Sequence, residues 1–267
     1  MKESSEDKLA RFLRKNPRLQ TAAAETIGFF LDRMNLKIAG EENFQTMREH
    51  LDANLGGAVV IGNHESIADY VVFRETRKRV PEDIAVVAPW AEKFLGEEMG
   101  PWGMIGQAMG AMDRIELIGI PQAATSENLR RLVDAISDMG EAVREGSVVC
   151  FFPQGTRSRT VGMTMARSGI VNKLFKDDEV KNNTIIIPVA VEGTRKIHEP
   201  NTRRVNPFAR VNLTAGKPFF YRDAQEEAAR SGVSVTDIMM WRIGRMLPEE
   251  YEGDYREIFA KIRDAGV

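Results

Sequence analysis

The chain has 267 residues, of which 43% are hydrophobic and 28% charged, and its formal net charge is -2. This length suits one large α/β domain with an appendage, and the composition is that of a globular chain rather than a disordered one. A nearly neutral chain has no bulk attraction for nucleic acid, so we expect no nucleic-acid partner. The single cysteine, Cys150, excludes an internal disulfide and a thiolate metal site, and it indicates a reducing compartment.

Residues 1–40 predict an N-terminal helical segment. Leu9, Phe12 and Leu13 recur at helical spacing among basic side chains, and helical character continues to residue 36. Two interpretations remain open: a helical cap packed on the main domain, or an interfacial helix whose basic residues meet anionic lipid head groups. The start of the chain is too acidic for a signal peptide, and no stretch reaches the ~20 apolar residues of a membrane span. We therefore expect a cytoplasmic protein, either soluble or peripheral on a membrane surface.

Residues 41–267 predict one domain of alternating strands and helices. Strands are expected at 58–62, 84–88, 147–152, 184–191 and 210–216, with a weaker candidate at 110–117. Helices are expected at 66–79, 91–98, 123–144, 164–176 and in the tail from 223. Continuously apolar strands are buried on both faces. The fold class is therefore α/β, with a mixed, largely parallel central sheet flanked by helices.

The stretch GNHESIADY, residues 62–70, follows the first of these strands. In open α/β sheets, ligands bind beyond the carboxyl ends of the strands, where Asn63 and His64 are expected. If Asp69 lies in the first turn of the next helix, its carboxylate can bond one imidazole nitrogen of His64. The other nitrogen can then take a proton from an alcohol. A buried structural histidine bonded to a carboxylate would have the same spacing.

A second polar stretch, FFPQGTRSR, follows the strand at 147–152. Gly155 lets the backbone approach a ligand, Thr156 offers a hydroxyl, and Arg157 offers a planar set of donors suited to phosphate. The alternative is a strand-ending turn with solvated arginines. Arg114, after the weak strand candidate, is a further possible phosphate ligand, although an isolated arginine there is more often a surface charge.

Taken together, these segments resemble the motifs of the glycerolipid acyltransferase family, which acylates glycerol-3-phosphate, lysophosphatidic acid and related lysophospholipids. The residues that match its four blocks in order are Asn63, His64 and Asp69; Gly110 and Arg114; Phe152, Pro153, Gly155, Thr156, Arg157 and Ser158; and Ile187, Pro188 and Val189. One position departs from the family pattern, because Gln154 stands where the third block usually has glutamate. Glutamine keeps an acceptor and adds donors, so we expect the site to be retuned rather than lost.

The resemblance implies acyl transfer from a thioester to a hydroxyl, with His64 as general base and Asp69 orienting it. Arg114 and Arg157, with Gln154, Gly155 and Thr156, would bind the acceptor. The acyl donor, acyl-CoA or acyl carrier protein, is a substrate, and no cofactor or metal is expected. Lysophosphatidic acid is the favoured acceptor and glycerol-3-phosphate the alternative, with possible peripheral membrane contact.

The sequence leaves two other functions to compare with acyl transfer, and one further segment with two interpretations. A non-catalytic lipid or phosphate binder on the same fold is the main alternative to an enzyme, and Gln154 is its support. An esterase is disfavoured, because the sequence has no G-x-S-x-G elbow and Cys150 lies inside a predicted strand. The glycine- and methionine-rich segment 99–112 is expected either to line an acyl site or touch a membrane, or to be a packed loop.

Overall fold

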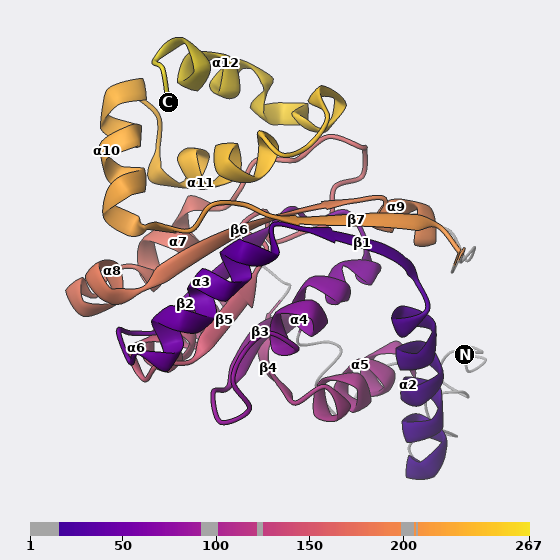
Figure 1. The fold of residues 1–267 in the computed structure, drawn as a ribbon. Coiled ribbons are helices and arrows are strands. Elements are labelled where there is room, and N and C mark those ends of the chain that lie inside the picture. The colour runs from indigo at the N-terminus through magenta and orange to yellow at the C-terminus, as the bar shows by residue number, and fades with distance from the viewer. Residues whose placement is uncertain (1–15, 92–100, 122–124, 199–205, 207) are drawn as a thin grey trace.

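The structure is a computed structural model, and it describes residues 16–91, 101–121, 125–198, 206 and 208–267 (Figure 1). Its strands are β1 Asn35–Ala39, β2 Ala58–Gly62, β3 Val86–Ala91, β4 Ile115–Ile120, β5 Val148–Phe151, β6 Ile185–Glu192, β7 Arg210–Ala215 and β8 Phe219–Phe220. Its α-helices are α2 Pro17–Asp32, α3 Glu41–Asp52, α4 Tyr70–Arg77, α5 Pro101–Met112, α6 Ser126–Arg144, α7 Ser168–Leu174, α8 Asp178–Asn183, α9 Thr194–Ile197, α10 Tyr221–Ser231, α11 Val235–Gly244 and α12 Arg256–Asp264. Short 3-10 turns are η1 Ile67–Asp69, η3 Glu249–Tyr251 and η4 Gly253–Tyr255.

The described strands form one sheet in the order β1-β7-β6-β2-β5-β3-β4, with β8 also paired to β6. Neighbouring strands are parallel except where β6 meets β7 and β8, which run antiparallel to it. The predicted α/β class with a mixed, largely parallel sheet is therefore confirmed. β2 lies between β5 and β6, so the turn that follows it meets the turns that follow both neighbours.

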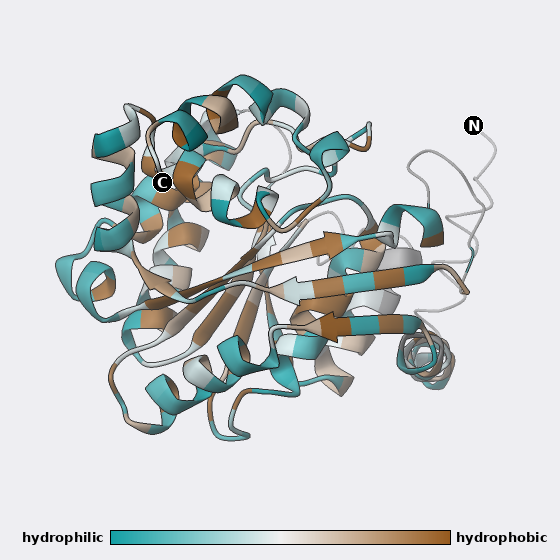
Figure 2. Ribbon diagram, turned by 45° about the horizontal axis from the view of Figure 1, so that its top comes forward, coloured by the Kyte–Doolittle hydropathy of each residue, from teal (hydrophilic) through white to brown (hydrophobic). Residues whose placement is uncertain are grey.

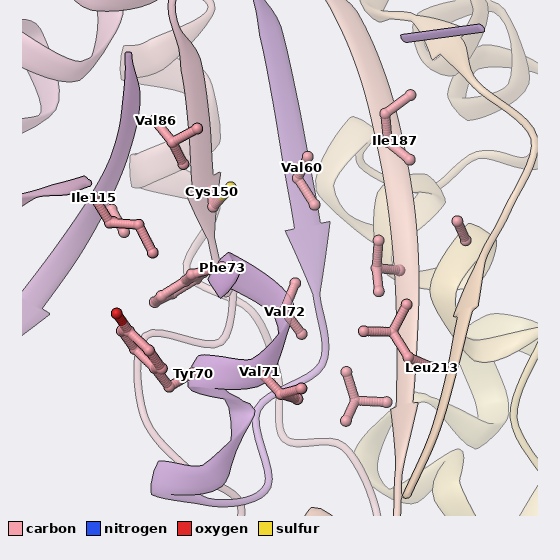
Figure 3. Packing of buried hydrophobic residues seen from close by; sticks show 14 of the residues in the cluster. Val60, Tyr70, Val71, Val72, Phe73, Val86, Ile115, Cys150, Ile187 and Leu213 are labelled. Carbon is pink, nitrogen blue, oxygen red and sulfur yellow. The ribbon is translucent and has the colours of Figure 1, made fainter. Parts of the chain in front are cut away.

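Alternate residues of the central strands enter two separate hydrophobic layers. Val60, Cys150 and Ile187 pack toward α3 and α4 on one face, and Figure 3 shows Val60 and Cys150 close to Val72 and Phe73 of α4. The opposite face packs against α6, α7 and the C-terminal helices α10 to α12, which stand together on one side of the sheet in Figure 1. In Figure 2 the strands are largely brown, whereas many outward helix surfaces are teal. Burial on both faces explains why these strands are continuously apolar in sequence.

The N-terminal helix ends earlier than the sequence predicts. Helix α2 stops at Asp32, and Asn35–Ala39 forms β1, a sheet-edge strand paired in parallel with β7. Its residues alternate between exposed and half-buried, the pattern of a strand with one covered face. Helix α2 lies against α5, and Arg74 of α4 donates to the Gly28 carbonyl oxygen at 2.8 Å. This packing is what a helical cap requires, and membrane contact stays a prediction because Leu9, Phe12 and Leu13 lie outside the described residues.

The glycine- and methionine-rich segment 99–112, for which a packed loop was one of the two interpretations, is from residue 101 on the helix α5. A side-chain carbon at Gly106 would lie 3.0 Å from the Trp90 ring, and one at Gly110 would lie 2.9 Å from Leu117. These glycines therefore allow the helix to lie close to β3 and β4 instead of forming a loop. The strand candidate at 110–117 begins only at Ile115, and all but the first residue of the predicted 91–98 helix lies outside the described residues. Throughout the described part of the chain, every helix falls short of the length and apolar character needed to cross a bilayer.

Candidate active site

The turn after β2 is tied to the sheet by Asn63. Its side-chain amide donates to the Val191 carbonyl oxygen at 2.8 Å, and the Val191 N–H donates back to Asn63 Oδ1 at 2.8 Å. The side chain thus continues the β2–β6 pairing where the β2 backbone turns away. This paired contact fixes the start of the turn.

His64 and Asp69 meet as the motif predicts. His64 Nδ1 lies 2.8 Å from Asp69 Oδ2, and the same oxygen accepts the backbone N–H groups of Glu65 at 2.6 Å and Ser66 at 2.9 Å. Several donors converge on the Asp69 carboxylate, so Nδ1 of His64 carries a proton and Nε2 is left as an acceptor. The Asp69 side chain is 1% exposed and that of His64 is 21% exposed. The carboxylate of the pair is therefore buried, whereas the imidazole is partly open to solvent.

The imidazole also rests on an aromatic wall. The rings of His64 and Phe152 stack with centroids 4.5 Å apart and an angle of 10° between planes. Phe152 in turn stacks on Phe73 of α4 at 5.1 Å. The ring orientation of His64 is thus set by its hydrogen bond at one edge and by packing on one face.

Thr194 is a partner of Asp69 that the sequence did not predict. Its hydroxyl donates a short hydrogen bond to Asp69 Oδ1 and lies 3.3 Å from Glu65 Oε2. Burial, and after it the neighbouring charge of Asp69, raises the pKa of Glu65 to about 8. Thr194 opens α9 immediately after β6, far from His64 in sequence. No local spacing signals this contact, because it depends on β6 lying beside β2.

Gln154 lies behind the His64 backbone and is 2% exposed. Its Oε1 accepts the His64 backbone N–H at 2.7 Å, and its Nε2 donates to Ser158 Oγ at 2.9 Å and Thr164 Oγ1 at 3.1 Å. The Ser158 N–H donates to the His64 carbonyl oxygen at 2.9 Å. Gln154 thus links the turns after β2 and β5, and its neutral amide supplies both the acceptor and the donors of that link.

Gly155, Thr156 and Arg157 form the exposed part of the turn after β5. Gly155 has a φ of 70°, the left-handed region that glycine adopts without strain, and its N–H donates to the Phe152 carbonyl oxygen at 2.9 Å. The side chains of Thr156 and Arg157 are exposed, so a ligand can reach them. The structure therefore brings this turn to the same edge of the sheet as His64.

Arg195 holds the chain that follows this turn, a role the sequence did not predict. Its guanidinium donates to the carbonyl oxygens of Ser158 at 3.1 Å and Thr160 at 2.8 Å, and to that of Arg159. A guanidinium engaged by three carbonyl groups acts as a fixed brace for the loop.

Arg114 is not brought to this edge. It precedes β4, with a φ of 54°, and its guanidinium lies 3.7 Å from the exposed carboxylate of Glu82. His64 follows the carboxyl end of β2, and β2, β5, β3 and β4 are parallel, so the two residues lie at opposite edges of the sheet. The sequence placed Arg114 after a strand, and that placement is wrong, because Gly110 belongs to α5 and the strand begins at Ile115.

Among the described residues, no group of three or more His, Cys, Asp or Glu is arranged to hold a metal ion. A histidine, the carboxylate bonded to it and an exposed basic turn are gathered at one edge of the α/β sheet.

The acyltransferase family matches residues 35–192, more than half of the chain, including β1 to β6 and the turns that carry His64, Asp69 and Arg157. The chain belongs to the acyltransferase family, which confirms the resemblance seen in its motifs. No curated protein matches it. Among solved structures it is similar to that of the 1-acyl-sn-glycerophosphate (LPA) acyltransferase PlsC from Thermotoga maritima. The TM-score is 0.50 and the identity 16%, covering 94% of this chain and 83% of that one, a likeness of fold.

Proposed function

We propose that the protein is an O-acyltransferase that moves a fatty acyl group from an acyl thioester to the hydroxyl of a phosphate-bearing glycerolipid precursor. The observation that supports this most is the 2.8 Å contact between His64 Nδ1 and Asp69 Oδ2 at the carboxyl edge of the sheet. Lysophosphatidic acid is the proposed acceptor and glycerol-3-phosphate the alternative. The donor is acyl-CoA or acyl carrier protein. Since a lipid acceptor lies in a membrane, the proposed location of the protein is the cytoplasm, at the cytoplasmic face of a membrane.

In the proposed reaction, His64 Nε2 takes the proton of the acceptor hydroxyl as its oxygen attacks the thioester carbonyl. The buried Asp69 carboxylate stabilises the imidazolium that forms. Collapse of the tetrahedral intermediate breaks the carbon–sulfur bond, and the thiolate takes the proton back from His64. The products are an ester and a free thiol, and His64 is restored.

The acceptor phosphate is proposed to bind at the exposed turn of Thr156 and Arg157. Arginine offers paired donors that match phosphate oxygens, and a fixed phosphate would hold the hydroxyl near His64. Arg195 supports the same loop from behind. We leave Arg114 out of this site because it lies at the opposite edge of the sheet.

A non-catalytic lipid or phosphate binder is the second candidate. Its sequence support was the uncharged Gln154, which in the structure links the His64 turn to the Ser158 turn. A glutamine with that role is compatible with a working base, so the observations favour the enzyme. A binder would retain an acyl donor or phospholipid without turnover.

The test is acyl transfer from labelled acyl-CoA and from acyl carrier protein, each offered lysophosphatidic acid or glycerol-3-phosphate. We expect His64→Ala to lower the rate at least ~100-fold with its circular dichroism unchanged. Arg157→Ala should raise the KM for the acceptor, whereas Arg114→Ala, the matched arginine at the far edge, should not. Equal rates for wild type and His64→Ala would refute the mechanism.

A further inference from the structure

Glu65 is a buried acid beside the base-bearing turn, and the proposed reaction does not use it. Its side chain is 2% exposed. Its Oε1 is buried without a hydrogen-bond partner among the described residues, and its Oε2 lies 3.3 Å from Thr194 Oγ1. An ionised carboxylate in such a place would be costly, because burial penalises the charged form.

The Thr194 hydroxyl lies between two carboxyl groups but has one proton to give. Its short contact with Asp69 Oδ1 assigns that proton to Asp69, which is also the acceptor for His64. The remaining contact, from Glu65 Oε2 to Thr194 Oγ1, is a hydrogen bond only if Glu65 supplies the proton. A carboxylic acid at Glu65 would therefore complete both contacts of the Thr194 hydroxyl, one as donor to Asp69 and one as acceptor from Glu65.

The groups around Glu65 agree with this assignment. Burial and the charge of Asp69 raise the pKa of Glu65 to about 8, against the smaller opposing effects of Arg195, the Gly193 N–H and a Thr194 hydroxyl turned to donate to the ionised form. Arg195 is the cation on this side, and its guanidinium is engaged by the carbonyl groups of residues 158–160. Tyr251 of η3 also faces Glu65, and burial raises the pKa of its hydroxyl, which stays neutral.

We infer that Glu65 is a positioning residue that stays protonated at neutral pH and donates through Thr194 to Asp69, so that the carboxylate is held in line with His64. The inference rests on the proposed function in that His64 is taken as the base. Loss of the Glu65 proton would replace this donor with a second negative charge beside Asp69, and the repulsion would disturb the carboxylate that orients the imidazole.

The first experiment measures kcat from pH 6 to 10 for wild type and Glu65→Gln. We expect the wild-type rate to fall with a midpoint near pH 8, and the fall to be absent in Glu65→Gln, whose amide donates to Thr194 at every pH. Glu65→Ala should lower kcat by about 10- to 100-fold, from misplacement of the carboxylate, and Glu65→Gln should restore most of the loss. The ionisation of the substrates is common to both proteins, so it cannot produce the difference.

A second pair of variants tests the route through Thr194. Thr194→Val removes the hydroxyl at nearly constant volume, and Thr194→Ser keeps it. We expect Thr194→Val to lower kcat, Thr194→Ser to retain most of it, and Glu65→Ala to add little to Thr194→Val, because both changes break one chain of hydrogen bonds. Fully additive losses would contradict the route.

A measurement without substrate separates this inference from the proposed function. The full chain has three histidines, so the ring signals of His64 can be followed by NMR after labelling histidine with 15N, together with the 13C carboxyl signal of Glu65. A midpoint near pH 8 in both signals of wild type, with no such step at His64 in Glu65→Gln, would support the inference even if no acyl transfer were found. A Glu65 midpoint near its ordinary value of about 4.3, or the same His64 curve in both proteins, would overturn it whatever the enzyme assay shows.

Discussion

Replacing Gln154 with methionine keeps the size of a buried side chain and removes its three hydrogen bonds. The His64 backbone N–H is then left without its acceptor, which costs about 1–3 kcal/mol for a buried donor. The hydroxyls of Ser158 and Thr164 each lose a bond worth about 0.5–1.5 kcal/mol, although a hydroxyl can turn toward another partner. Burial of the apolar methionine side chain is favourable and offsets part of this loss of stability. We expect the free energy of unfolding to fall by about 2–4 kcal/mol.

The assay is urea unfolding followed by tryptophan fluorescence, with Gln225→Met as the matched control. Gln225 is an exposed glutamine of α10, so its replacement should stay within about 0.5 kcal/mol of wild type. Gln154→Glu should cost less than Gln154→Met, because a carboxylate keeps the acceptor for His64 and the two hydroxyls can reverse to donate to it. If Gln154→Met were as stable as the Gln225 control, the linking role of Gln154 would be refuted.

Three other predictions address the surroundings of the site. Arg195→Ala should raise the KM for a phosphate-bearing acceptor about tenfold, because the loop of residues 158–160 loses its brace; an equal rise in the donor KM in initial-rate measurements would count against this. Glu65 has a folded-state pKa of about 8, above its ordinary unfolded value, so the folded chain binds the extra proton and wild-type stability should fall as pH rises from about 5 to 8. When the free energy of unfolding from urea titrations is plotted against pH, the wild-type curve should fall relative to that of Glu65→Gln by up to ~1.4 kcal/mol per pH unit. Parallel curves for the two proteins would contradict this prediction. Burial raises the pKa of Cys150 to about 12, so a disulfide reagent at pH 8 should label the thiol only after unfolding; rapid labelling of the native protein would show the strand to be accessible.

Strands and helices with a strong pattern were predictable from the sequence. The runs that became β2, β5 and β6 are continuously apolar because helices cover both faces of the sheet. Helix α6 was equally clear, and the Thr125 hydroxyl caps it by accepting the Asn128 N–H. In these segments local propensity and tertiary burial favour the same structure.

Segments whose structure depends on their neighbours were not predictable in the same way. β1 has five residues, and its pairing partner is β7, which lies far along the chain. Nothing near β1 in sequence therefore marks it as a strand. Helix α3 follows directly and was also missed. The glycines of α5 left a packed loop as one interpretation of residues 99–112, because their packing against Trp90 and Leu117 becomes visible only in three dimensions.

The candidate site divides along the same line. His64 and Asp69 are five residues apart and their contact could be predicted from spacing, since both lie in one turn. Thr194 and Arg195 follow the carboxyl end of β6, far from His64 in sequence. They meet its turn only because β6 lies beside β2 in the sheet. Arg114 was assigned to the site from its motif position. The strand was expected to begin before Arg114 but begins after it, so Arg114 lies at the other edge of the sheet.

The paired contact between Asn63 and Val191 has a consequence for how the protein would lose activity. Loops usually open at a lower free energy than the core, so many active sites fail before the fold does. Here the turn that carries His64 is joined to the central β6 strand by the same kind of bonds that hold the strands together. Opening this turn would require breaking hydrogen bonds to β6, a central strand of the sheet. Inactivation by denaturant should therefore coincide with global unfolding, and the Val191 amide should exchange with solvent as slowly as the core.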